Sequence, residues 1–300
     1  MVIEMTARFV GVDWGTSNRR AYVYGAGGEV LRQAEDGQGM LASRGRFAAA
    51  LDELLQQLEV SAETPVLMSG MVGSAQGWRE APYLDPQVPL LDMPQHLVHL
   101  DGARFIVPGY RQREGLADVM RGEETQLLGL VVNGLRDGWV VLPGTHCKWV
   151  YLKNGCIQRW STYMTGEMFA MLSRDGTLAP LLEGGADVAE AFEAGLALAR
   201  RGLPLTNTLF SVRAGVVGGT LPAAHARSLV SGLLIGSEFV AMAASRHAGD
   251  EITLLASLSL CAPYQRAARS FGITAKVADS HALYASAMRH LYQEGKNHAA

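Results

Sequence analysis

A short turn near the amino terminus carries the groups that a bound metal–phosphate complex requires: Asp13, Gly15, Thr16, Ser17 and Asn18. A carboxylate can hold a magnesium ion through the water molecules around the ion. A glycine lets backbone N–H groups approach a phosphate closely, and the polar side chains add donors. The turn therefore predicts a phosphate site with Asp13 as the metal ligand, although an ordinary polar hairpin turn has the same composition.

A second Gly-Thr turn follows the hydrophobic run 139–142 and repeats the design of the first. Gly144, Thr145 and His146 supply backbone and side-chain donors for phosphate oxygens. Lys148 could add a cation, or it could lie on a solvated strand face. The pair of turns predicts two related domains that close on one nucleotide.

A Gly-rich loop at 70–78 follows a short buried run at 65–69. In α/β proteins, loops at strand ends often bind ligands. The backbone N–H groups of this loop, the Gln76 amide and the Trp78 indole N–H would suit a small polar ligand. The alternative is a connecting loop in which Trp78 is a core anchor.

The elements that must position these residues are short strands and amphipathic helices. Apolar runs at 9–14 and 19–24 predict a β-hairpin around the first turn. Helical spacing or composition predicts helices at 46–58, 115–135, 188–200, 229–246, 263–271 and 282–291. The turn at 137–138 divides the chain into an expected N-terminal domain, 1–136, and a C-terminal domain, 137–300, with the last helix able to pack back on the first domain.

Composition restricts the class of protein. The chain has 300 residues, of which 48% are hydrophobic and 18% charged, so it is a globular protein. A formal net charge of -3 argues against a nucleic-acid partner. The chain has neither a G-x-G-x-x-G fingerprint after a strand nor a Walker A sequence, so Rossmann and P-loop readings have little support.

Cysteine usage and hydropathy bear on the compartment. The three cysteines lack metal-ligand spacing and fit free thiols in a reducing compartment. No apolar signal segment is evident at the amino terminus. The longest apolar stretch, 229–244, carries Ser231, Ser237 and Glu238, which favours a buried helix over a membrane span. We therefore expect a cytoplasmic protein without a membrane partner.

Six segments in order resemble the 2-dehydro-3-deoxygalactonokinase family, within the actin, sugar kinase and Hsp70 superfamily. The similarity runs over essentially the whole chain, in segments 13–18, 69–78, 80–83, 118–126, 143–149 and 165–167. The resemblance implies an α/β, two-domain actin-like ATPase (ribonuclease H-like) fold, with mixed sheets flanked by helices and an interdomain cleft. Two departures are Cys147, where the family more often has Ser, and Ala256, where the adenosine segment often reads Gly-Ser.

The activity that the resemblance implies is ATP- and Mg²⁺-dependent phosphorylation of the C6 hydroxyl of 2-dehydro-3-deoxy-D-galactonate, in galactonate catabolism. A small-molecule sugar acid and ATP are then the partners. The resemblance is compatible with a homo-oligomer and does not require one. The gluconate epimer or another 2-keto-3-deoxy sugar acid is an alternative substrate. An actin-like ATPase without a sugar acceptor is the alternative from another class.

The resemblance also implies roles for individual residues. Asp118 is the first candidate for the catalytic base, Glu123 the second and Glu124 the third, although each could be a helix-start acid favoured by the helix dipole. Ser257 would contact the adenosine. Arg121, Arg79, Arg19 and Arg20 are candidates for the substrate carboxylate. The expected substrate-binding residues are Gly70, Met71, Gly73, Gln76, Gly77, Trp78, Tyr83 and Arg121.

Overall fold

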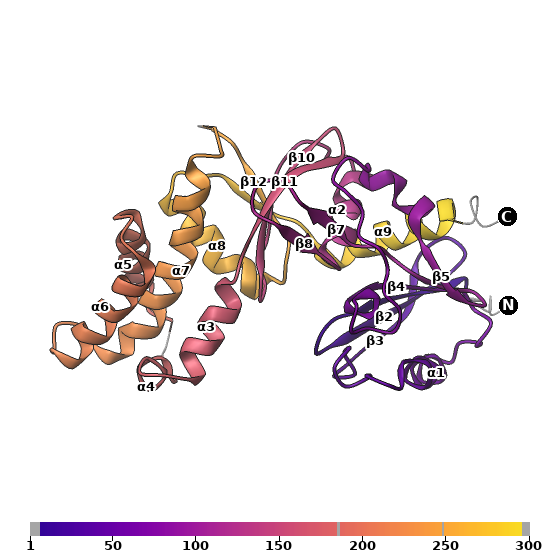
Figure 1. Cartoon of the computed structure of the whole chain (residues 1–300), viewed down its shortest axis with the longest axis horizontal. Coiled ribbons are helices and arrows are strands. Elements are labelled where there is room, and N and C mark those ends of the chain that lie inside the picture. Colours follow the sequence, from indigo (N-terminus) through magenta and orange to yellow (C-terminus); the bar gives the residue numbers. More distant parts are fainter. Residues whose placement is uncertain (1–6, 185–186, 248, 296–300) are drawn as a thin grey trace, which may run out of the picture. The chain divides into compact units, whose positions relative to one another are not determined.

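The computed structural model describes residues 7–184, 187–247 and 249–295 (Figure 1). The chain forms two compact units. The first takes in the chain up to Asp137, the segment Leu152–Arg159 and the chain from Ser280 on. The second takes in Gly138–Tyr151 and Trp160–Asp279. Each unit has its own sheet and its own buried core.

The first unit is built on a six-stranded mixed sheet in the order β3-β2-β1-β4-β6-β5. The strands β1 (Phe9–Trp14), β2 (Arg19–Tyr24) and β3 (Val30–Asp36) form an antiparallel meander. β4 (Val66–Gly70) runs parallel to β1, β6 (Arg104–Ile106) runs parallel to β4, and β5 (Val98–Asp101) closes the edge. β1 and β4 are central and almost wholly buried, which explains their continuous apolar sequences.

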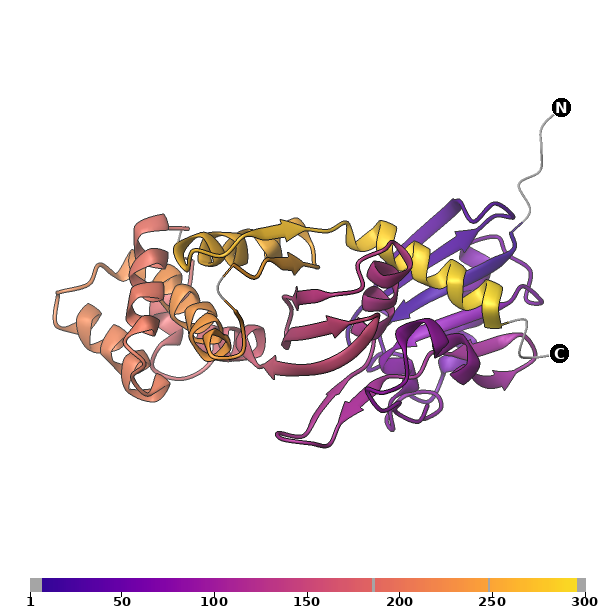
Figure 2. The same ribbon diagram turned by 90° about the horizontal axis from the view of Figure 1, so that it is seen from above.

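Helices cover this sheet and a small two-stranded sheet stands beside it. The apolar face of α1 (Phe47–Gln57) joins the core around Trp14, and α9 (Ser280–Gly295) runs alongside the strands (Figure 2). α9 also packs on α2 (Glu123–Val132), where a Cβ on Gly129 would lie 2.2 Å from the Leu283 carbonyl oxygen. The remaining elements are β7 (Tyr110–Gln112), β8 (Asp118–Met120), η1 (Met71–Gly73) and η2 (Leu90–His96).

The second sheet has the order β11-β10-β9-β12-β13. Its strands are β9 (Gly138–Leu142), β10 (Cys147–Lys153), β11 (Cys156–Tyr163), β12 (Ile252–Leu254) and β13 (Ala275–Val277). β12 is parallel to both β9 and β13. The core on this sheet is centred on Trp149 and Phe239.

Helices make up most of the second unit. They are α3 (Thr165–Arg174), α4 (Ala179–Leu182), α5 (Ala189–Arg200), α6 (Leu205–Val217), η3 (Ala223–His225), α7 (Ala226–Ala243) and α8 (Leu258–Ser270). α5 and α7 cross closely because two glycines meet backbone. A Cβ on Gly195 would lie 2.2 Å from the Leu229 oxygen, and one on Gly232 would lie 2.1 Å from the Phe192 oxygen.

The structure confirms the predicted α/β class with mixed sheets and corrects some elements. The helix expected at 115–135 begins only at Glu123, and Asp118 lies in β8. Gly122, at φ 115°, breaks the chain direction between the two. The helix α6 was not predicted.

One stretch among the described residues, Ala223–Ala243, is long and apolar enough to cross a membrane. Within it, 67% of the apolar window is buried inside the protein, and α7 packs against α5. The prediction of a buried core helix for 229–244 is therefore confirmed.

Candidate active site

The first turn is held rigidly while its polar residues stay exposed. Gly15 N–H donates to the Asn18 carbonyl at 2.9 Å and closes the turn between β1 and β2. Met40 N–H donates to the Gly15 carbonyl at 2.8 Å, and Leu41 N–H to the Thr16 carbonyl at 3.1 Å. Thr16 through Asn18 are exposed. The turn can thus present donors to a ligand without a change in its backbone.

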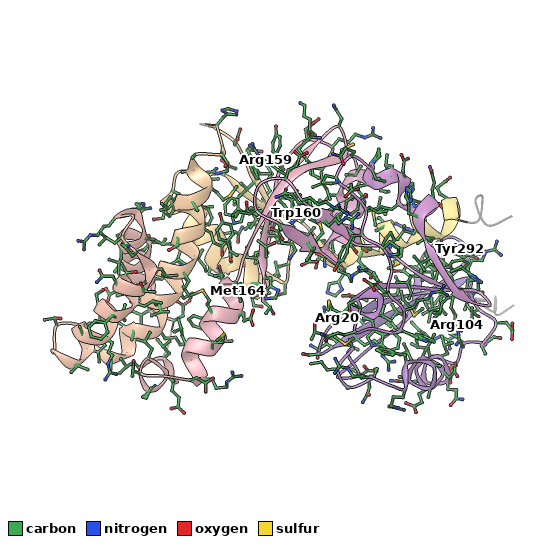
Figure 3. The ribbon with its side chains drawn as sticks, viewed as in Figure 1. Arg20, Arg104, Arg159, Trp160, Met164 and Tyr292 are labelled. Atoms are coloured by element: carbon green, nitrogen blue, oxygen red, sulfur yellow. The ribbon has the colours of Figure 1, made fainter. Side chains whose placement is uncertain are left out.

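Asp13 is the last residue but one of β1, the strand before this turn, and it is partly buried. Burial raises the pKa of the Asp13 carboxyl to about 6. The Arg20 guanidinium, which extends from β2 (Figure 3), opposes this rise, and the charges of Glu123 and Glu35 add to it. Arg20 itself pairs with Glu35 at 2.9 Å. Asp13 is therefore ionised at neutral pH, at a cost that a bound cation would offset.

Asp13, the end of β4 and the start of α2 are far apart in the sequence but pack one against the next. A Cβ on Gly70 would lie 3.4 Å from Asp13 Oδ1, and a Cβ on Gly122 would lie 3.4 Å from the Gly70 Cα. Both glycines have positive φ, at 88° and 115°, which a side chain rarely adopts. The end of β4 thus approaches the aspartate closely, and the start of α2, which carries Glu123, approaches the end of β4.

The acids at the start of α2 have different partners. Glu124 is fully buried and accepts the Gly122 N–H at 2.7 and 2.9 Å, and burial raises its pKa to about 7. Glu123 is partly exposed, and its Oε2 accepts the Arg121 N–H at 3.1 Å. Asp118 Oδ1 accepts the N–H of its neighbour Val119 at 2.8 Å. Of the three base candidates, Glu123 is the one whose charge acts on Asp13.

The Gly-rich loop is fastened at both ends. Trp78 N–H donates to the Val72 carbonyl at 2.8 Å, and Ala81 N–H to the Gly73 carbonyl at 2.9 Å. The Trp78 ring stacks on Phe47 with centroids 6.2 Å apart, so it anchors the loop to the core. The loop's outer residues, including Gln76, stay exposed.

Arg121 lies under this loop. Its Nη2 donates to the Ala81 carbonyl at 2.8 Å, its Nε to the Tyr83 hydroxyl at 3.3 Å, and its guanidinium stacks over the Tyr83 ring at 4.1 Å. Its Nη1 is buried without a hydrogen-bond partner, 3.0 Å from where a Cβ on Gly73 would lie. The hydroxyl of Ser74 is likewise buried and unpartnered. Two unsatisfied polar groups therefore flank Gly73.

The other candidate arginines have partners elsewhere. Arg19 is buried and pairs with Asp36 at 2.7 Å, and Arg79 donates to the His99 carbonyl at 3.3 Å. Arg44, which sequence reasoning missed, donates to the Gln76 side chain at 2.9 Å. Ser74 was not among the predicted site residues, because no sequence pattern indicates that its hydroxyl is buried and unpaired.

In the second unit, the Gly144–His146 turn packs against the N-terminal end of α3. Glu167 N–H donates to the Thr145 carbonyl at 2.9 Å, and His146 Nε2 lies 2.7 Å from Glu167 Oε2. A Cβ on Gly166 would lie 2.4 Å from the Gly144 carbonyl oxygen. Thr145 and His146 are exposed, as a phosphate-binding turn requires.

The strand after this turn is buried. Lys148 is 3% exposed, so the alternative of a solvated strand face for this residue is wrong. Cys147 is fully buried, as predicted for a small core residue, and burial raises the pKa of its thiol.

A hollow lies beside the second turn, and a larger hollow adjoins it. One, of about 130 Å³, is lined by Gly144, Thr165 and Gly166 among others. The other, of about 490 Å³, shares four lining residues with it: Phe169, Ser231, Leu260 and Pro263. Ser257 is exposed at the N-cap of α8, and its hydroxyl lies 3.1 Å from that of Ser259, which lines the larger hollow.

The chain is similar to known proteins over most of its length. The family profile described as 2-keto-3-deoxy-galactonokinase matches residues 13–291. The chain is 37% identical over 285 residues to the 2-dehydro-3-deoxygalactonokinase of Escherichia coli (strain K12), covering 92% of this chain and 95% of that protein.

Two solved structures are similar to the whole chain. A protein of Sinorhizobium meliloti, described as a candidate 2-dehydro-3-deoxygalactonokinase, superposes with a TM-score of 0.90 and 34% identity over 95% of this chain and 98% of that one. The activator of 2-hydroxyisocaproyl-CoA dehydratase from Clostridium difficile, solved with ADPNP, gives a TM-score of 0.54 at 12% identity over 96% of each chain. At that identity the likeness concerns the fold alone, and it agrees with the predicted ATPase fold.

Proposed function

The chain belongs to the 2-keto-3-deoxy-galactonokinase family, and we propose that it transfers the γ-phosphate of ATP to the C6 hydroxyl of 2-dehydro-3-deoxy-D-galactonate. The observation that carries this proposal is the match over residues 13–291, which includes every candidate site residue. As a carbohydrate kinase of this family, the chain takes part in galactonate catabolism.

Phosphoryl transfer needs positioned phosphates, neutralised charge and a group that accepts the hydroxyl proton. For the proton acceptor we put Glu123 first, because it begins α2 next to Gly122, which lies against Gly70, and because its charge acts on the Asp13 carboxyl. Asp118 is the other candidate, on β8 rather than on the helix. Glu124 is less suited, since its carboxylate is fully buried and bonded to the Gly122 N–H.

Asp13, a desolvated carboxylate on which the charge of Glu123 acts, fits a magnesium ion. Mg²⁺ is usually held by one or two carboxylates together with waters and substrate phosphates. The rise of the Asp13 pKa to about 6 reflects a carboxylate that is desolvated and close to a like charge, which a cation would relieve. When bound, the ion would supply neutralisation of the charge on the β- and γ-phosphates.

The proposed ATP contacts come from both units. In the first, Gly15, Thr16, Ser17 and Asn18 would donate to the phosphates from an exposed and rigid turn. In the second, the corresponding residues are Gly144, Thr145 and His146, with Lys148 adding charge from the buried strand behind them. The larger hollow, lined by Ser259 next to Ser257, and the smaller hollow adjoining it would take the adenosine.

For the sugar acid we propose the loop 70–78 together with Tyr83 and Arg121. The support is physical: a buried guanidinium N–H without a partner costs about 1–3 kcal/mol, and an anionic ligand would satisfy it. Of the Arg121 nitrogens, Nη1 is the one left for a substrate carboxylate, because Nη2 and Nε already donate to the Ala81 carbonyl and the Tyr83 hydroxyl. The proposed contacts are Gly70, Met71, Gly73, Gln76, Gly77 and Trp78, and we add Ser74 because its buried hydroxyl has no partner.

We also propose that the enzyme is cytoplasmic and binds neither nucleic acid nor membrane. Its net charge of -3 argues against a nucleic-acid partner. The proposal includes both a monomer and a homo-oligomer.

ADP release, coupled to NADH oxidation, tests the function on a panel of 2-keto-3-deoxy sugar acids. We expect the galactonate compound to give the highest kcat/KM and to require Mg²⁺. A higher kcat/KM for the gluconate epimer would reassign the substrate. ATP hydrolysis or assembly without any sugar-dependent ADP release would support an actin-like ATPase and overturn the proposal.

A further inference from the structure

Glu238 is a buried acid that none of the proposed catalytic steps uses. It lies in the middle of α7 and is 1% exposed. A buried carboxylate is unfavourable by several kcal/mol unless its oxygens are fully hydrogen-bonded. The side chains that donate hydrogen bonds to Glu238 therefore indicate its structural role.

Four donors surround the Glu238 carboxylate. Trp149 Nε1 donates to Oε2 at 2.7 Å, and the Tyr264 hydroxyl donates to Oε1 at 2.6 Å. The Thr165 hydroxyl and the Cys147 thiol are two further donors, whose interaction with the carboxylate lowers the pKa of Glu238. A separation of 2.6 Å is typical of a hydroxyl donating to an ionised carboxylate. These donors act against the rise that burial causes in the pKa of Glu238.

The four donors come from the elements that form the proposed nucleotide site. Cys147 and Trp149 belong to β10, which begins directly after the Gly144–His146 turn. Thr165 is the first residue of α3, next to the Gly166 that packs on that turn. Tyr264 belongs to α8, the helix that Ser257 begins.

The hollow beside the turn adds an independent observation. Gly144, Thr165 and Tyr264 all line the cavity of about 130 Å³. Two of the Glu238 partners therefore share a wall with the second Gly-Thr turn. A shift of either partner would change the shape of the surface that receives the nucleotide.

We propose that Glu238 is a positioning residue for nucleotide binding: its carboxylate ties β10, α3 and α8 together and fixes the Gly144–Thr145 turn for the phosphates. The inference rests on the proposed function only in taking this turn as a phosphate site. It predicts an effect on the nucleotide and none on the sugar acid, whose proposed contacts lie in the first unit.

The test is isothermal titration of full-length wild-type protein and variants with Mg·ADP and, separately, with 2-dehydro-3-deoxygalactonate. Glu238→Gln places an NH₂ group among four donors, so we expect the Kd for ADP to rise about tenfold or more, with the sugar-acid Kd within about twofold. Ser237→Ala is the matched control on the same helix, since its hydroxyl bonds only to the Leu233 carbonyl among the contacts described. It should leave both constants unchanged.

Tyr264→Phe is the second variant, because it removes one donor and keeps the carboxylate. It should weaken ADP binding in the same direction but less, and it decides the matter if Glu238→Gln does not fold. An unchanged ADP Kd in the variants, or an equal loss of sugar-acid binding, would overturn the inference and leave Glu238 a purely structural residue. Because ADP titration needs no acceptor, a selective ADP effect in a protein without sugar-kinase turnover would reject the proposed function and keep this inference.

Discussion

Substitution of Gly166 by Ala tests how closely the second Gly-Thr turn depends on α3. An added Cβ would lie 2.4 Å from the Gly144 oxygen and 2.9 Å from the Thr145 Cα, both backbone atoms that cannot rotate away. Ordinary van der Waals contact begins near 3.4 Å, so the turn must move by about 1 Å. A misplacement of about 1 Å in a positioned reacting group can reduce the rate about 100-fold.

Helix propensity and packing at the turn predict opposite changes in the free energy of unfolding for Gly166→Ala, so the measured sign distinguishes them. Gly→Ala inside a helix ordinarily stabilises it by up to about 1 kcal/mol. Overpacking at the turn should instead destabilise the protein by about 1–3 kcal/mol.

Urea unfolding and steady-state kinetics with ATP as the varied substrate measure both effects of Gly166→Ala. The control is Gly37→Ala, because a Cβ there meets nothing within 4 Å and its φ is not positive. We expect kcat/KM for ATP to fall about 100-fold in Gly166→Ala and to be unchanged in the control. A Gly166→Ala protein that is more stable and fully active would refute the reasoning.

Three further predictions concern the first unit. Because burial raises the pKa of Asp13 to about 6, the ionised carboxylate is lost as the pH falls through 6. The apparent Mg²⁺ affinity should therefore be weaker at pH 5.5 than at pH 7.5. A pH-independent affinity, or full activity in Asp13→Ala, would reject the metal role. Glu123→Gln should lower kcat by about 10²–10⁴-fold while Asp118→Asn changes it far less, and the reverse order would return the base to Asp118. Arg121→Lys should raise the KM for the sugar acid much more than the KM for ATP, since Lys lacks the Nη1 group that we propose for the substrate carboxylate. Equal changes in both constants would contradict a substrate role.

Local sequence was sufficient for the elements around Asp13. Continuous apolar runs on either side of a polar turn leave few alternatives to a hairpin, and the same holds around Gly144. The buried helix at 229–244 was equally clear, because its apolar residues cover all its faces.

The position of Asp118 could not be read in the same way. Its strand has three residues and is defined by pairing with Tyr110–Gln112, a contact that spacing within 115–135 does not reveal. The helix then begins at Glu123, directly after Gly122, which has a φ of 115° and lies close to Gly70. Both facts come from tertiary structure, and together they place Glu123 rather than Asp118 at the helix start.

The buried polar groups were also outside the reach of sequence patterns. Lys148 and Glu238 read as charged residues in apolar elements, and only packing shows that both are almost fully buried. The helix α6 was missed because its Thr, Asn, Ser and Val residues have low helix propensity, and its packing on α7 compensates for this.

The most direct test of the central claim is identification of the product. The protein is incubated with ATP, Mg²⁺ and 2-dehydro-3-deoxy-D-galactonate, and the product is analysed by ³¹P and ¹³C NMR. The account predicts one new phosphate monoester, with phosphorus coupling to C6 of the sugar acid. Phosphorus coupled to another carbon, or ADP formed without any phosphorylated sugar acid, would contradict it.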